Sequence, residues 1–138
     1  MRRFSCLVAA GLLLACGQAS VFSLPVGTCF DDQPEGEISS VPEVDCSEPH
    51  DNEVFALINY SEADTYPGTD QLSEISESLC IAEFEGYVGL DYNSSALAVF
   101  PIYPTEESWK NDNDREIICA LYNADLSKLT GSMEGAAQ

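Results

Sequence analysis

The hydrophobic positions along the chain form several short strand-like runs and one longer stretch with helical spacing. Runs that are continuously apolar, or that alternate with polar residues, are typical of β-strands. Such runs occupy residues 25–30, 41–46, 53–60, 97–103 and 116–123. The runs at 53–60 and 116–123 are the most regular, so both are expected near the centre of a sheet. Pro101 lacks an amide proton and therefore favours an edge position or a bulge for its strand.

One long helix is predicted from about residue 69 to Gly89. Thr69 or Asp70 can cap its N-terminus, and Gly89 is a suitable residue for its C-terminal cap. Apolar residues recur along it at helical spacing, namely Leu72, Ile75, Leu79 and Ala82. Glu83 falls on the same side, so the buried face is expected to turn toward Phe84.

The order of these elements predicts the fold class. Strands come first, then the long helix, then further strands, and Thr105 is expected to cap a short helical turn before Trp109. Residues 129–132 are expected to pair briefly before a frayed tail. This order favours the α+β class, with a small antiparallel sheet and one main helix packed on one of its faces.

The N-terminal residues have the layout of a secretory signal peptide. Arg2 and Arg3 precede a short apolar run at 7–15, which is well below the about 20 residues that span a bilayer. Cys16 directly follows Leu-Leu-Ala, which resembles the cleavage and lipidation site of bacterial lipoproteins. The resemblance implies a diacylglyceryl anchor on Cys16 and a location at the outer face of the cytoplasmic membrane. An ordinary signal peptide with a chance cysteine is the alternative.

These features divide the chain into four segments. We expect a lipoprotein signal peptide at 1–15, a short tether at 16–24, one domain at 25–133 and a tail at 134–138.

The net charge narrows the range of partners. The chain carries 24 acidic residues and a formal charge of -19, which becomes -21 when Arg2 and Arg3 leave with the signal peptide. Such a surface repels nucleic acid and anionic lipid, so nucleic acid is not expected as a partner. A membrane contact is expected only through the lipid anchor at Cys16.

The cysteines indicate a disulfide framework. Cys6 is lost with the signal peptide and Cys16 is lipidated, which leaves Cys29, Cys46, Cys80 and Cys119. Four cysteines outside the cytoplasm allow three connectivities. We favour Cys29–Cys46, which flanks a loop, together with Cys80–Cys119, which ties the helix to a late strand. A four-cysteine zinc site is the rival, but no C-x-x-C spacing supports it.

An ordered set of short motifs resembles the septum formation domain of actinobacterial envelope proteins. The matching pieces are Gly27-Thr28-Cys29-Phe30, Cys46 to Val54 with His50 and Glu53, Tyr66-Pro67-Gly68, Cys80, Phe84, Tyr87-Val88-Gly89, Tyr103-Pro104-Thr105, Ser108-Trp109, Arg115, Cys119 and Gly131-Ser132. The resemblance implies an extracytoplasmic domain linked to formation of the division septum. It implies no catalytic residues.

Several residues were considered as chemical sites. His50 beside Asp51 could act as a base or a pH switch, although a structural histidine bonded across its turn is the simpler interpretation. Asp112, Asp114 and Glu116 have part of the spacing of a calcium loop, but Ile117 replaces its required glycine. Tyr66, Tyr103 and Trp109 could form an aromatic patch for a partner, or could pack at the sheet edge.

The sequence therefore predicts a lipid-anchored, non-enzymatic binding or scaffold domain of the cell envelope, with envelope or division proteins as partners. No catalytic residue, metal or cofactor is assigned. His50, Tyr66, Tyr103 and Trp109 are the candidate binding residues. The alternatives are a wall-acting hydrolase that uses a carboxylate pair, and a lipoprotein that binds cations or small ligands.

Overall fold

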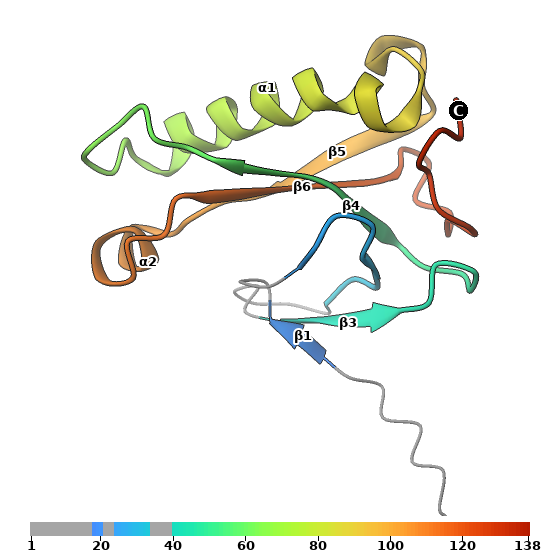
Figure 1. Cartoon of the computed structure of the whole chain (residues 1–138), viewed down its shortest axis with the longest axis horizontal. Coiled ribbons are helices and arrows are strands. Elements are labelled where there is room, and N and C mark those ends of the chain that lie inside the picture. Colours follow the sequence, from blue (N-terminus) through green and yellow to red (C-terminus); the bar gives the residue numbers. More distant parts are fainter. Residues whose placement is uncertain (1–17, 21–23, 34–39) are drawn as a thin grey trace, which may run out of the picture.

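The computed structural model describes residues 18–20, 24–33 and 40–138, and Figure 1 shows their arrangement. Six strands form an antiparallel sheet in the order β1-β3-β2-β4-β6-β5. The strands are β1 (Gln18–Ser20), β2 (Cys29–Phe30), β3 (Ser40–Val44), β4 (Asn52–Asn59), β5 (Leu97–Ile102) and β6 (Glu116–Asn123). The helices are α1 (Thr69–Val88), the 3₁₀ turn η2 (Tyr92–Ser94) and α2 (Glu106–Asn111). The predicted α+β class, with one main helix over an antiparallel sheet, is confirmed.

The strands that are most regular in sequence lie at the centre of the sheet. β4 pairs with β2 and β6, while β5 pairs with β6 alone, so the edge position expected from Pro101 is confirmed. The run at 25–30 yields only the two residues of β2. The chain turns just before them, where the Thr28 amide donates to the Pro25 carbonyl and Gly27 has a φ of 89°.

The fold begins before residue 25. β1 pairs with β3, and Leu24 is buried in the core, although both lie in the segment expected to be a tether (16–24). The C-terminal residues also differ from the expected frayed tail. The amides of Gly135 and Ala137 donate to the carbonyls of Tyr87 and Val88 at 2.8 and 2.9 Å. Figure 1 shows the chain end beside the C-terminal end of α1.

The buried face of α1 is rotated relative to the predicted stripe. The buried residues recur every four positions, namely Leu72, Ser76, Cys80, Phe84 and Val88, whereas Ala82 is exposed. The turn toward Phe84 is confirmed, and the disulfide at Cys80 lies on this same face. Gly68 rather than Thr69 or Asp70 occupies the N-cap, while Gly89 caps the C-terminus in the left-handed conformation as predicted.

The core lies on both faces of β4 and β6. On the α1 face, the rings of Phe55 and Phe84 meet edge to face with 5.9 Å between centroids. The other face is covered by the N-terminal residues, and its buried cluster consists of Leu24, Phe30, Val41, Val54, Ile118 and Ala120. Figure 1 shows α1 and the β1–β3 ribbon on opposite sides of these central strands.

Two disulfides join these layers, and both have the favoured connectivity. Cys29–Cys46 links β2 to the turn after β3, and Cys80–Cys119 links α1 to β6. Two smaller predictions are also confirmed. Thr105 caps α2 through a reciprocal bond with Ser108, and Leu129 forms a bridge with His50. Among the described residues, no helix is both long and apolar enough to cross a membrane.

Removing each disulfide should lower stability according to the length of chain that it closes. The sequence separations are 17 for Cys29–Cys46 and 39 for Cys80–Cys119. Loop entropy then predicts losses of about 3 and about 4 kcal/mol for the two paired Cys→Ala variants. Urea unfolding of the oxidised proteins measures this order. Non-reducing peptide maps that join Cys29 to Cys80 or Cys119 would overturn the connectivity itself.

Candidate functional site

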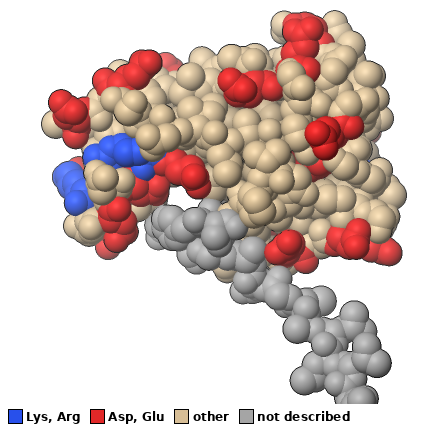
Figure 2. Space-filling view, in the orientation of Figure 1, with Lys and Arg blue, Asp and Glu red and all other residues tan. Residues whose placement is uncertain are grey.

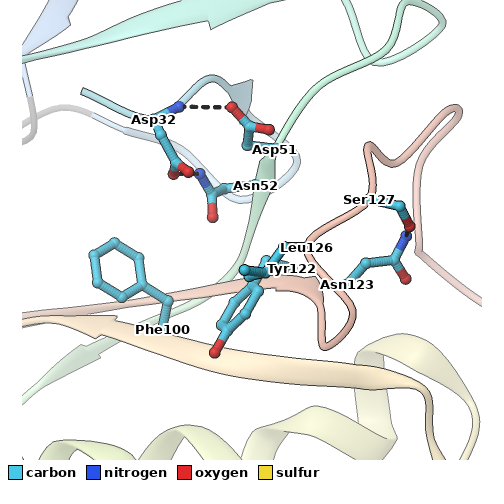
Figure 3. A pocket seen from close by; sticks show the side chains of 8 residues that line it. All are labelled: Asp32, Asp51, Asn52, Phe100, Tyr122, Asn123, Leu126 and Ser127. Atoms are coloured by element: carbon cyan, nitrogen blue, oxygen red, sulfur yellow. Dashed lines mark hydrogen bonds between the residues drawn. The ribbon is translucent and has the colours of Figure 1, made fainter. Parts of the chain in front are cut away.

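A cavity of about 240 Å³ lies on the face of the sheet opposite α1. Its lining comes from five segments of the chain, as Figure 3 shows: Asp32, Asp51, Asn52, Phe100, Tyr122, Asn123, Leu126 and Ser127. Strand register brings them together. Asn52 and Ala98 both pair with Tyr122, and because side chains alternate along a strand, Phe100 shares the face of Tyr122. We call this cavity the acidic–aromatic pocket.

A network of charged and polar groups fixes one wall of the pocket. Lys128 forms ion pairs with Asp31 at 2.8 Å and with Asp51 at 2.9 Å. The Asp32 amide donates to Asp51 Oδ2 at 2.9 Å, and Asn52 Nδ2 donates to Asp32 Oδ1 at 2.8 Å. The segment after β2 is thereby held against the start of β4.

The pKa values of Asp51 and Lys128 follow from these contacts. Partial burial opposes ionisation of Asp51, but the hydrogen bonds from Lys128 and from the Asp32 amide hold its pKa below the usual value. Hydrogen bonds to Asp31 and Asp51 raise the pKa of Lys128. Both partners are therefore charged across the neutral range.

Glu53, next to Asn52 on β4, lies on the α1 face of the sheet and is fully buried at 0% exposure. Its Oε1 accepts hydrogen bonds from the Tyr87 hydroxyl at 2.7 Å and the Ser132 hydroxyl at 2.6 Å, and its Oε2 accepts from the Met133 amide at 2.7 Å. Burial and the bond to Glu53 raise the pKa of Tyr87. One carboxylate thus joins β4, the end of α1 and the C-terminal segment.

His50 is a structural histidine in this fold. It is fully buried, and its Nδ1 lies 2.8 Å from the Glu48 carbonyl, which accepts the ring proton. Bonding across the turn is therefore confirmed, and the ring is not on the surface where a binding role would place it. Its Nε2 has no hydrogen-bond partner among the described residues.

The described residues bring together one group of possible metal ligands, namely Cys29, His50 and Glu53, with ligand atoms within 4.8 Å of one another. The donor set does not suit a metal ion in this state. Cys29 Sγ is in a disulfide, so it is not the thiolate that binds metals. Both oxygens of Glu53 already accept hydrogen bonds.

The aromatic residues do not form the exposed patch that was considered. Trp109 is only 3% exposed, with the Arg115 guanidinium 3.6 Å from its ring centroid and Tyr66 edge-on at 5.7 Å. Tyr60, which the sequence did not single out, lies at 6.4 Å. Tyr103 is half-buried against the core on the α1 face. These contacts bury the indole, while Tyr66 and Tyr60 beside it are partly buried.

The turn after α2 is built around Asp114. Its Oδ2 accepts from the Ser108 hydroxyl and its Oδ1 from the Glu116 amide, each at 3.1 Å. Partial burial and the nearby Asp114 charge raise the pKa of Glu116. Asp114 therefore acts as a local cap, and the calcium-like spacing produces no converging carboxylates among the described residues.

Sequence reasoning missed the pocket itself. Asp51 and Asn52 stood in the motif around His50, yet nothing in their spacing pairs them with Tyr122 seventy residues later in the chain. Cys16, the predicted lipidation residue, lies outside the described residues.

The fold and the pocket define a small disulfide-linked α+β domain that presents an acidic cavity with an aromatic floor. The chain belongs to the septum formation family, whose sequence model matches residues 17–138. The comparisons with curated proteins and with solved structures gave no match. Family membership indicates a role related to septum formation and an association with the cell envelope.

Replacing Glu53 with Gln should destabilise the fold and loosen the C-terminal segment. The new amide nitrogen must face either the Met133 amide or the two hydroxyls, which leaves a buried donor unpaired at a cost of about 1–3 kcal/mol. Denaturant unfolding and hydrogen exchange at the amides of Gly135 and Ala137 measure the effect. Glu134→Gln, an exposed neighbour, is the control and should match the wild type. Unchanged exchange in Glu53→Gln would contradict the role of this carboxylate.

Replacing Lys128 with Gln should remove stability mainly between about pH 5 and pH 10. The pKa of Asp51 is lower in the folded protein than in the unfolded chain. Asp51 therefore contributes its full share of the free energy of unfolding above its unfolded pKa, about 3.9, and this share is lost as pH falls through the folded pKa. The pKa of Lys128 is higher in the folded protein than in the unfolded chain. Lys128 therefore contributes its full share of the free energy of unfolding below its unfolded pKa, about 10.4, and this share is lost as pH rises through the folded pKa. Because the pair is partly exposed, we expect about 0.5–1 kcal/mol. Unfolding curves that differ equally at pH 2.5 and pH 7 would contradict this assignment.

Proposed function

We propose that this chain is a lipid-anchored, non-enzymatic binding domain that contributes to septum formation through protein contacts at the outer face of the cytoplasmic membrane. The acidic–aromatic pocket is the observation that carries the proposal. It is concave, has an apolar floor, and is rimmed by polar groups that neighbouring residues hold in place, which is the usual form of a binding site. Membership of the septum formation family supports the biological setting.

The short distance between Cys16 and the first strand supports close contact with the membrane. β1 begins at Gln18, two residues after Cys16, so an extended connection reaches only about 7 Å. A diacylglyceryl group on Cys16 would then hold the domain at the membrane surface. Acidic side chains are spread over the face shown in Figure 2, while the basic ones gather at the α2 end.

The state of the ionisable groups supports binding rather than catalysis. A general acid or base must reach its substrate, whereas His50 is fully buried and bonded to the Glu48 carbonyl. Asp51 is ion-paired with Lys128, and Glu53 accepts three hydrogen bonds inside the core. The wall-acting hydrolase, the main rival, would need a carboxylic acid and a free carboxylate that face each other across a substrate cleft.

The anchor is tested by Cys16→Ser, with Cys6→Ser as the matched control inside the signal peptide. We expect Cys16→Ser to move the protein from the membrane pellet to the soluble fraction, because one thioether-linked diacylglyceryl group supplies the attachment. Cys6→Ser should leave the protein in the pellet. Membrane association that survives Cys16→Ser would show that the anchor proposal is wrong.

The binding role is tested by affinity purification from crosslinked envelopes with the anchor intact. Recovery of division or wall-synthesis proteins is the expected result. If only lipid and wall fragments are recovered, and the purified protein degrades cell wall in vitro, the binding role would be replaced by the hydrolase.

A further inference from the structure

We propose that the acidic–aromatic pocket binds the guanidinium group of an arginine side chain that a partner protein of the envelope presents. This inference rests on the proposed binding function and names the chemistry of the partner at that site. Three properties of the pocket carry it: the hydrogen bonds still free on its walls, its charge, and its floor.

Several donors on the pocket walls are already used within the protein, including one hydrogen of each side-chain amide. Asn52 Nδ2 donates to Asp32, and the Asp32 amide donates to Asp51. Asn123 Nδ2 donates to the Ser127 hydroxyl at 3.1 Å, and that hydroxyl donates to Asp125 at 2.6 Å.

The walls also offer acceptors. Figure 3 shows the amide oxygen of Asn52, a residue only 3% exposed, directed into the cavity, while the Tyr122 hydroxyl points away from the two aspartates. A ligand that brings hydrogen-bond donors therefore matches these acceptors.

The charge around the pocket favours a cation. Asp31, Asp32 and Asp51 stand at this wall, and Lys128 is the one basic residue that pairs with any of them in the described part of the chain. Lys128 contacts Asp31 and Asp51 and does not line the cavity. Asp32 has no basic partner among the described residues, so its carboxylate is available to an incoming cation.

The floor and the size of the cavity favour arginine. Phe100 and Tyr122 share one face of the sheet and present aromatic surface to the cavity (Figure 3). A guanidinium is planar, stacks on aromatic rings and pairs with carboxylates through two parallel hydrogen bonds, whereas an ammonium does neither as well. A volume of about 240 Å³ is below the about 300–1,000 Å³ of pockets for whole small molecules, and suits one side chain.

Arg115 and Trp109 show the same chemistry elsewhere in this molecule. There the guanidinium stacks on the indole at 3.6 Å while its Nη1 donates to the carbonyls of Trp109 and Asp114. The acidic–aromatic pocket offers the aromatic surface and the acceptors of that arrangement, with the guanidinium still to be supplied.

The test is an NMR titration of the ¹⁵N-labelled full-length protein in detergent micelles with the peptide Ac-Gly-Arg-Gly-NH₂. We expect shifts at the amides of Asp32, Asn52 and Asn123. The citrulline peptide has nearly the same shape without the charge, and should bind at least about tenfold more weakly. Asp32→Asn should weaken the arginine peptide about tenfold, whereas Glu107→Gln, an exposed acid on α2, should not.

Three results would overturn the inference. These are shifts spread over the acidic surface, equal binding of the citrulline peptide, or an Asp32→Asn protein that binds as the wild type does. A lysine peptide that binds as tightly would refute the choice of arginine. The proposed binding function has a separate test, because it is refuted only if the wild-type protein recovers no envelope partner in the affinity purification. If the wild-type protein and the Asp32→Asn variant recover the same partners, the proposed binding function stands and the arginine site in this pocket is refuted.

Discussion

The hydrogen bonds to the buried carboxylate of Glu53 are the interactions on which the rest of the structure depends. Removing a charge from water costs several kcal/mol unless hydrogen bonds replace its hydration. Here the Tyr87 and Ser132 hydroxyls and the Met133 amide supply three bonds of 2.6–2.7 Å, and no basic residue in the described part of the chain pairs with the carboxylate. Since these donors come from α1 and the C-terminal segment, the charge is stable only when both are docked. The same strand then presents Asn52 to the pocket on its opposite face.

The two disulfides hold different parts of the fold in place, one at the helix and one near the pocket. Cys80–Cys119 fixes α1 on one face of the sheet. Cys29–Cys46 fixes the short β2, which Asp31 and Asp32 follow directly, to the turn after β3. Lys128 completes the connection by holding Asp31 and Asp51 together. The pocket wall is consequently set by covalent and ionic links rather than by a large core, which suits a binding surface in a small domain.

Local signals predicted the elements, and long-range register determined the site. The hydrophobic runs of β4 and β6, Gly89 as a helix cap and the four remaining cysteines could all be read from neighbouring residues. The turn of the buried face of α1 toward Phe84 was also indicated locally, by Glu83 within the apolar stripe. The sequence leaves Trp109 open between a surface patch and packing at the sheet edge, because its partners Arg115 and Tyr60 lie outside its own helix. The pocket unites residues 32 to 127, and no local pattern encodes that meeting.

We propose that partners contact this chain through the acidic–aromatic pocket. Leu126 is 78% exposed and lines the pocket, whereas Glu77 is exposed on α1, remote from it in sequence and on the opposite face of the sheet. A photo-crosslinking benzoylphenylalanine placed at either position in living cells compares the two surfaces. We expect adducts from position 126, mapped beside an arginine of an envelope protein, and none of these from position 77. Equal capture from both positions, or capture from position 77 alone, would contradict it.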